Sequence, residues 1–225
     1  MVTFQMSQNL YDEWASLWHR LHAKGPADRT FEALNQSYAT PPRAYHNLNH
    51  IAHCLDEFRS SRHLALNPDA LAWALWFHDA IYDSQAKDNE QQSAGLAQQV
   101  ASEAGLSPTF INQVISLILA TTHISPPAPG DEALITDIDL AILGQPPAKF
   151  DEYERQIREE YAWVDDALFT QGRSTVLASF LVRPAIYQTE WFGNKYEKLA
   201  RENLGRSLAN WKAASLSRPH AGPIA

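Results

Sequence analysis

Apolar residues recur along most of the chain with the period of an α-helix that buries one face. In the first such segment they are Leu10, Trp14, Leu17, Trp18 and Leu21, at offsets of four, seven, eight and eleven. No segment alternates between apolar and polar positions as a half-buried strand would. We therefore predict an all-α protein, and the frequent breaks between segments favour an orthogonal helical bundle over a long coiled coil.

Prolines, glycines and small polar residues predict where the helices begin and end. Side chains that can accept a hydrogen bond from first-turn N–H groups precede several of the apolar segments. These candidate N-caps are Asn49, Asn67, Asp88, Ser107 and Asp131. In the last third of the chain, the predicted buried positions are Phe150, Tyr153, Ile157 and Tyr161, then Val176, Phe180 and Leu181, before a final helix over residues 194–211.

The length of 225 residues suits one large domain or two small ones. We predict one helical domain over residues 1–214, with a central part over about residues 43–144 and C-terminal helices over 148–214. Residues 215–225 are polar and contain proline and glycine, so we predict a disordered tail there.

Charge and cysteine content narrow the range of functions. The formal net charge of −8 argues against binding of a nucleic acid polymer, which requires a basic surface. The single cysteine, Cys54, rules out an internal disulfide, fits a reducing compartment and is expected to pack as a small core residue. We recognise no secretory signal and no apolar run near the ~20 residues of a membrane span. The expected location is the cytoplasm.

The stretch over residues 71–83 contains the first candidate chemistry. An almost wholly apolar run leads directly into His78 and Asp79. Burying an imidazole and a carboxylate there without partners would be costly. A mutual hydrogen bond with a water molecule would offset that cost, and so would a divalent metal ion bound by both side chains.

Two further polar residues share this kind of position at a helix end or on an apolar face. They are His50 and Asp139, and with His78 and Asp79 they supply two imidazoles and two carboxylates. Such a mixed set suits one ion of Mn²⁺, Fe²⁺, Co²⁺, Ni²⁺, Zn²⁺ or Mg²⁺ and leaves octahedral positions for water and substrate. The sequence does not choose among these metals.

The order His, then His-Asp, then Asp on helices resembles the HD-domain superfamily of metal-dependent phosphohydrolases. The similar segments are residues 45–51, 77–83, 88–94 and 137–144, and they look like a bacterial branch of predicted phosphohydrolases. The resemblance is strong over residues 43–144 and loose elsewhere. It implies an HD-like fold, with His50, His78, Asp79 and Asp139 as the metal ligands.

The sequence differs from this family at the position expected for the catalytic base. HD nucleotidases often place a glutamate four residues after the histidine of the doublet, and here that residue is Tyr82. A tyrosine hydroxyl ordinarily keeps its proton near neutral pH. The nearest carboxylates are Asp83 and Glu90, and we predict that one of them is the base. The extra paired histidines of two-metal cyclic-dinucleotide phosphodiesterases are not recognised.

Other polar residues are candidates for supporting roles. Arg43 and Lys87 could neutralise a phosphate, and His123 could supply a fifth ligand or a phosphate contact. His46, four residues before His50, could ligate or lie outside the ligand set. Asp137 competes with Asp139, because residues two apart do not share a helix face.

The leading functional prediction is hydrolysis of a phosphate ester or anhydride in a small phosphorylated, nucleotide-like metabolite, assisted by one divalent ion. A di-iron oxygenase of the HD type is the first alternative, and it would need His46 and His123 as additional ligands. A non-catalytic module that binds a metal or nucleotide for regulation is the second. The sequence leaves the substrate and the oligomeric state open.

Overall fold

The structure is a computed structural model that describes residues 4–216, and this part of the chain contains helices and no strand. The all-α prediction is confirmed, while the HD-like arrangement remains a prediction. The chain divides after Asp139 into two compact units, and whether they act as the single domain expected over residues 1–214 stays a prediction. No described helix is both long and apolar enough to cross a bilayer.

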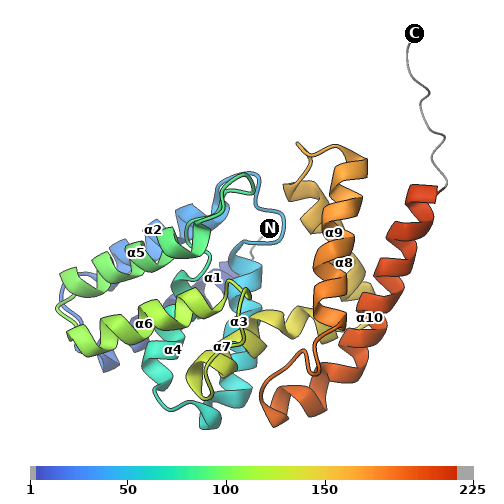
Figure 1. The fold of residues 1–225 in the computed structure, drawn as a ribbon. Helices are drawn as coiled ribbons and strands as arrows, with labels where there is room; N and C mark the ends of the chain where they lie inside the picture. Colours follow the sequence, from blue (N-terminus) through green and yellow to red (C-terminus); the bar gives the residue numbers. More distant parts are fainter. Residues whose placement is uncertain (1–3, 217–225) are drawn as a thin grey trace. The chain divides into compact units, whose positions relative to one another are not determined.

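Over residues 4–139, which the structure describes, the first unit forms seven α-helices and one short 3₁₀ helix (Figure 1). They are α1 (Phe4–Arg20), α2 (Ala27–Ala39), α3 (Leu48–Ser61), η1 (Arg62–Leu64), α4 (Pro68–Phe77), α5 (Asn89–Glu103), α6 (Pro108–Ala120) and α7 (Asp131–Asp139). Helices α5 and α6 run side by side, and α4 packs against both of them and against α1, α3 and α7.

Helix α4 is the centre of this unit because it is apolar on every side. All its residues from 70 to 77 are buried. Trp73 has no exposed surface, and its ring lies 5.2 Å from that of Trp14 and 5.8 Å from that of Trp18, centroid to centroid. This packing fixes the last turn of α4, which His78 and Asp79 follow directly.

Two of the predicted helix caps are confirmed and a third is displaced. The side chains of Asn67 and Ser107 accept hydrogen bonds from N–H groups in the first turns of α4 and α6. Helix α3 is capped by Asn47, whose side chain accepts from the Asn49 N–H at 2.8 Å. The prediction of Asn49 as the cap was wrong because α3 begins at Leu48, two residues before the start that an Asn49 cap implies.

The two aspartates predicted as caps behave differently from expectation. Asp88 occupies the N-cap position of α5 but forms no capping hydrogen bond through its side chain. Asp131 is the first residue of α7, and its buried carboxylate accepts the N–H groups of Leu66 and Asn67 at 2.7 and 2.8 Å. Asp131 therefore joins the start of α7 to the start of α4, the helix that leads to the His-Asp pair.

The described part of the second unit, residues 140–216, forms one 3₁₀ helix followed by three α-helices. They are η2 (Leu140–Gly144), α8 (Pro147–Glu160), α9 (Asp166–Leu181) and α10 (Glu190–Leu216). On α9 the predicted burial of Phe180 is confirmed, but Val176 is 43% exposed and Leu181 is only partly buried, because the helix buries Phe169 and Leu177. Helix α10 is longer than predicted and includes residues 215 and 216, so the disorder predicted for these two residues was wrong. Residues 217–225 of the predicted tail lie outside the described residues.

Gly144 permits a close approach between η2 and α10. A Cβ atom there would lie 2.7 Å from two ring carbons of Tyr196. Gly144→Ala should therefore lower the free energy of unfolding by about 1–3 kcal/mol through overpacking. Gly205→Ala is the matched control, because it lies on α10 with open space around it and should stabilise slightly. Denaturant unfolding of both variants tests this, and equal effects would contradict it.

Candidate metal centre

Three helix ends bring the predicted ligands together within the first unit. His50 lies in the first turn of α3, His78 and Asp79 follow the last residue of α4, and Asp139 is the last residue of α7. The side chain of Asp139 reaches this cluster, and Asp137 is fully buried two residues earlier. The expected convergence from three helices is confirmed.

One atom from each side chain faces a common point. The Nε2 atom of His50 lies 3.1 Å from Nε2 of His78, 3.3 Å from Oδ2 of Asp79 and 3.2 Å from Oδ1 of Asp139. The Nε2 atom of His78 lies 3.2 Å from the same Asp79 oxygen and 3.5 Å from the same Asp139 oxygen. Ligands about 2.1 Å from an ion lie about 3.0 Å apart at adjacent octahedral positions and about 3.4 Å apart at tetrahedral ones. The observed spacing is therefore that of a ligand set.

A backbone contact orients one of the imidazoles. The Nδ1 atom of His78 lies 3.0 Å from the carbonyl oxygen of Leu75, to which it can donate a hydrogen bond. With its proton on Nδ1, neutral His78 presents a lone pair on Nε2 toward the cluster. This is the tautomer that a metal ligand requires.

The cluster has a buried side and a partly open side. The imidazoles of His50 and His78 are each 1% exposed, whereas the carboxylates of Asp79 and Asp139 are 15% and 16% exposed. Solvent therefore approaches past the carboxylates. An ion held here could accept water or a substrate oxygen from that side, as the open position of a catalytic metal site requires.

Burial and the attraction between opposite charges shift the pKa values of the histidines and aspartates of the cluster in opposite directions. Burial disfavours the charged forms, yet the pKa values of His50 and His78 are raised well above 6.5 by nearby acidic groups, including Cys54 for His50 and Asp79 for His78. Against the same penalty of burial, the surrounding imidazoles hold the pKa values of Asp79 and Asp139 well below 3.8. Without a metal, the cluster is therefore an ion-paired group.

These pKa shifts predict opposite pH trends with and without metal. The imidazole contribution to stability is complete below pH 6.5 and is lost as pH rises through the raised pKa values. The carboxylate contribution is complete above pH 3.8 and is lost as pH falls through the lowered values. Above pH 6.5 the metal-free protein should therefore lose this contribution, while a metal that requires deprotonated ligands should bind more tightly. The measurement is the difference in Tm between Mn²⁺ and chelator, which should grow from about pH 6 to about pH 8. A difference that stays constant would contradict the assignment.

His123 contacts Asp139 from the outer side. Its Nε2 atom lies 2.9 Å from Oδ2 of Asp139, whereas Oδ1 is the oxygen that faces His50 and His78. The backbone of His123 has a φ of 55°, a left-handed conformation that costs free energy for residues other than glycine. In this arrangement His123 orients the carboxylate of Asp139, and its predicted contact with the ion or a phosphate stays a prediction.

His123→Asn should weaken metal binding by about 10–100-fold, the usual cost of losing a residue that orients a ligand. Asparagine tolerates positive φ, so the backbone should be retained, but its side chain is too short to replace the bond to Asp139. Metal titration with a circular dichroism spectrum of each variant tests this. Unchanged affinity would show that Asp139 needs no such support.

Arg43 has a structural contact that the sequence analysis missed. Its guanidinium donates hydrogen bonds to the backbone carbonyls of His46, Asp79 and Ala80 at 3.0, 2.7 and 2.9 Å. Arg43 thereby ties the loop before α3 to the turn after α4, and it fixes the backbone of one proposed ligand. Its predicted contact with a phosphate stays a prediction.

The structure does not place the other predicted catalytic and substrate residues in contact with the cluster. Asp83 is exposed, and its Oδ1 accepts the Gln85 N–H at 2.8 Å in a local turn. Lys87 is exposed, and Glu90 lies partly exposed in the first turn of α5. Their roles as base or phosphate contacts remain predictions.

His46 and Tyr82 form a stacked pair beside the cluster. Their ring centroids lie 4.1 Å apart with an interplanar angle of 25°. Burial raises the pKa of Asp79, but His78 and His50 lower it more than burial raises it, and nearby His46 makes a smaller contribution in the same direction. His46 therefore lies beside the cluster, and its role as a ligand stays a prediction.

Cys54 also belongs to the cluster, although the sequence predicted it only as a core residue. It is fully buried, as expected, and its Sγ lies 3.7 Å from both Nδ1 and Nε2 of His50. Ligand atoms of His50, Cys54, His78 and Asp139 all lie within 4.8 Å of one another, so these four residues could hold a metal ion. The spacing of four residues between His50 and Cys54, which puts both on one helix face, was the signal in the sequence.

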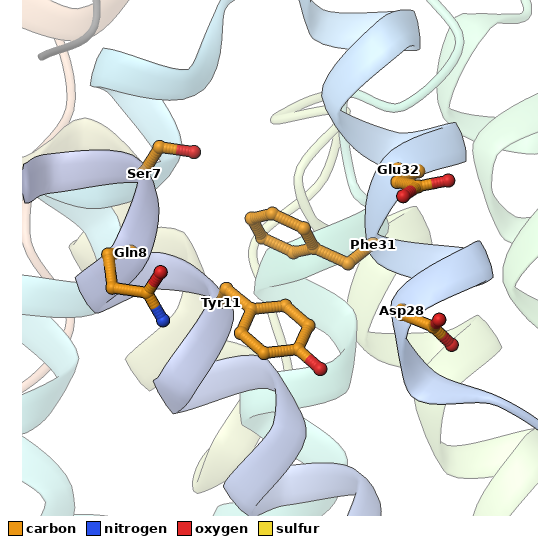
Figure 2. A pocket seen from close by; sticks show the side chains of 6 residues that line it. All are labelled: Ser7, Gln8, Tyr11, Asp28, Phe31 and Glu32. Atoms are coloured by element: carbon orange, nitrogen blue, oxygen red, sulfur yellow. The ribbon is translucent and has the colours of Figure 1, made fainter. Parts of the chain in front are cut away.

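A hollow of about 210 Å³ between α1 and α2 offers different chemistry. Figure 2 shows the rings of Tyr11 and Phe31 facing it, and their centroids lie 5.4 Å apart in an edge-to-face arrangement. Asp28 and Glu32 on its rim are exposed, and no imidazole lines it. The hollow therefore lacks the mixed, partly buried donor set of the cluster on α3, α4 and α7.

Comparisons with protein-family models, curated proteins and solved structures returned no match to this chain. The case for a function therefore rests on the residues and on the geometry of the cluster.

Proposed function

We propose that the protein is a metal-dependent phosphohydrolase, with His50, His78, Asp79 and Asp139 as ligands of one divalent ion. The observation that supports the metal site is the approach of four donor atoms to one another at the spacing of a ligand set. Phosphate chemistry is supported by the resemblance of the motifs around these residues to HD phosphohydrolases. The proposed substrate is a small phosphate ester or anhydride, such as a nucleotide.

When bound, such an ion polarises a phosphoryl oxygen and activates water for attack on phosphorus. The protein's part is to hold the ion from its buried side with two imidazoles. The partly exposed carboxylates of Asp79 and Asp139 stand at the side from which substrate would enter. Their two negative charges would balance the two positive charges of the ion, so a phosphate would bind by direct coordination at the open positions of the ion.

A divalent cation would satisfy the facing nitrogen and oxygen atoms of this cluster better than protons do. Two imidazole nitrogens only 3.1 Å apart cannot both direct lone pairs at each other without a proton or a metal between them. A divalent ion would satisfy both nitrogens and both carboxylate oxygens at once, whereas a proton satisfies only one pair.

The decisive experiment is release of inorganic phosphate from a panel of nucleotides and phosphorylated metabolites with Mn²⁺, Co²⁺ or Mg²⁺. Activity should depend on metal and be lost in Asp79→Asn. His53→Ala is the control, because His53 lies on α3 three residues after His50 and has Glu57 as a partner at 3.7 Å. Metal binding without turnover on any substrate would favour a regulatory module, and a visible spectrum that requires iron would favour a di-iron oxygenase.

A further inference from the structure

The cluster contains two overlapping ligand sets that share three residues. His50, His78 and Asp139 belong to both, and the fourth ligand is either Asp79 or Cys54. The two choices differ in chemistry, because a carboxylate favours ions such as Mg²⁺ and Mn²⁺ whereas a thiolate favours thiophilic ions such as Zn²⁺ and Cd²⁺.

The present geometry favours Asp79. Its Oδ2 lies 3.3 Å from Nε2 of His50 and 3.2 Å from Nε2 of His78, and these distances are similar to those between the other donor atoms. The Cys54 sulfur is equidistant from the two ring nitrogens of His50, at 3.7 Å. A point equidistant from both nitrogens lies on the plane that bisects the ring, and so it lies off the lone-pair axis of Nε2.

The sulfur lies within 4.8 Å of the ligand atoms of His50, His78 and Asp139, so a change in one side-chain torsion could bring it into the ligand set. Cys54 has one side-chain torsion, and rotation about it moves Sγ without moving α3. Because His50 and Cys54 lie one turn apart on α3, both side chains face the same side of the helix. The exposed edge of Asp79 allows that carboxylate to turn to solvent when it is displaced, whereas Cys54 is fully buried.

We propose that thiophilic divalent ions bind this site through Cys54 in place of Asp79 and thereby block it. This inference rests on the proposed function, since it concerns the regulation of the same site. Coordination replaces the S–H bond of Cys54 with a sulfur–metal bond, and the proton passes to solvent. The resulting set of two imidazoles, one carboxylate and one thiolate supplies four protein ligands, the number that closes a tetrahedral structural zinc site. It leaves no position for water and substrate, whereas the Asp79 set leaves two positions on an octahedral ion.

The test titrates Cd²⁺ and Mn²⁺ separately into wild type, Cys54→Ser, Cys54→Ala and Asp79→Asn. Cadmium bound by a thiolate has an ultraviolet charge-transfer band, and wild type should develop it at one equivalent of Cd²⁺. Both Cys54 variants should lose the band and bind Cd²⁺ at least about tenfold more weakly, with Mn²⁺ affinity nearly unchanged. Asp79→Asn should show the reverse, with Mn²⁺ binding weakened and the cadmium band retained. The alanine variant guards against misfolding caused by a buried hydroxyl.

Each result separates the two proposals. Wild-type Cd²⁺ binding without the band, or equal Cd²⁺ affinity in the Cys54 variants, would overturn the role of the thiol and leave the proposed phosphohydrolase intact. Absence of Mn²⁺, Co²⁺ and Mg²⁺ binding in wild type would instead overturn the proposed function, while a cadmium band would still support sulfur ligation.

Discussion

Replacing His78 with alanine is expected to abolish uptake of a divalent ion. His78 supplies one of four donor atoms, and its Nδ1 contact with Leu75 fixes its orientation before any ion arrives. Zinc sites in small domains bind with roughly 10–16 kcal/mol, so an equal share for one ligand is about 3 kcal/mol, or a factor of a hundred or more. The variant also leaves His50, Asp79 and Asp139 with an incomplete set. Metal analysis after dialysis and the metal-induced rise in Tm both measure the loss.

His53→Ala is the control for this experiment, and it should bind metal like wild type. Because His78 is buried, its removal could also weaken the fold, so circular dichroism of metal-free His78→Ala must show retained helix before its metal content is interpreted. Equal metal content in wild type and folded His78→Ala would refute the assignment of this ligand.

The period of apolar residues was enough to predict the helical class, because burying one face imposes that period on a helix. It was less able to predict which face of α9 is buried. Val176 and Leu177 are adjacent and both apolar, and packing within the second unit buries Leu177 and leaves Val176 exposed. Tertiary contacts, which a local pattern does not contain, decided between them.

The ligand set could be anticipated because its residue types are unusual within apolar helices. The surrounding contacts could not, since each depends on residues distant in sequence. The backbone carbonyl of Asp79 accepts a hydrogen bond from Arg43, 36 residues away in sequence. The outer carboxylate oxygen of Asp139 contacts the imidazole of His123, 16 residues away. A phosphate contact was the natural prediction for an arginine before a histidine motif, but its hydrogen bonds to backbone carbonyls appear only in three dimensions.

Removal of the catalytic base is expected to cause a large loss of hydrolysis rate. Asp83→Asn or Glu90→Gln should retain the metal and lose about 10²–10⁴ in rate if that carboxylate accepts the proton from the attacking water. Asp83 is the stronger candidate from its position, one residue after Tyr82. Its Oδ1 accepts the Gln85 N–H, and asparagine can keep this bond through its own side-chain oxygen. The Asp83→Asn variant therefore removes the charge and preserves the turn.

Both variants should be assayed with metal content measured in parallel, once a substrate has been identified. A rate loss with full metal occupancy in one variant assigns the base to that residue, and the other variant then serves as the matched control. Glu90 would have to act from the first turn of α5, where its partly exposed carboxylate also suits the helix dipole. If both variants keep nearly wild-type rates, neither carboxylate is the base. The proton would then have to pass to solvent or to another group beside the cluster, and the stacked pair of His46 and Tyr82 would be the next to test.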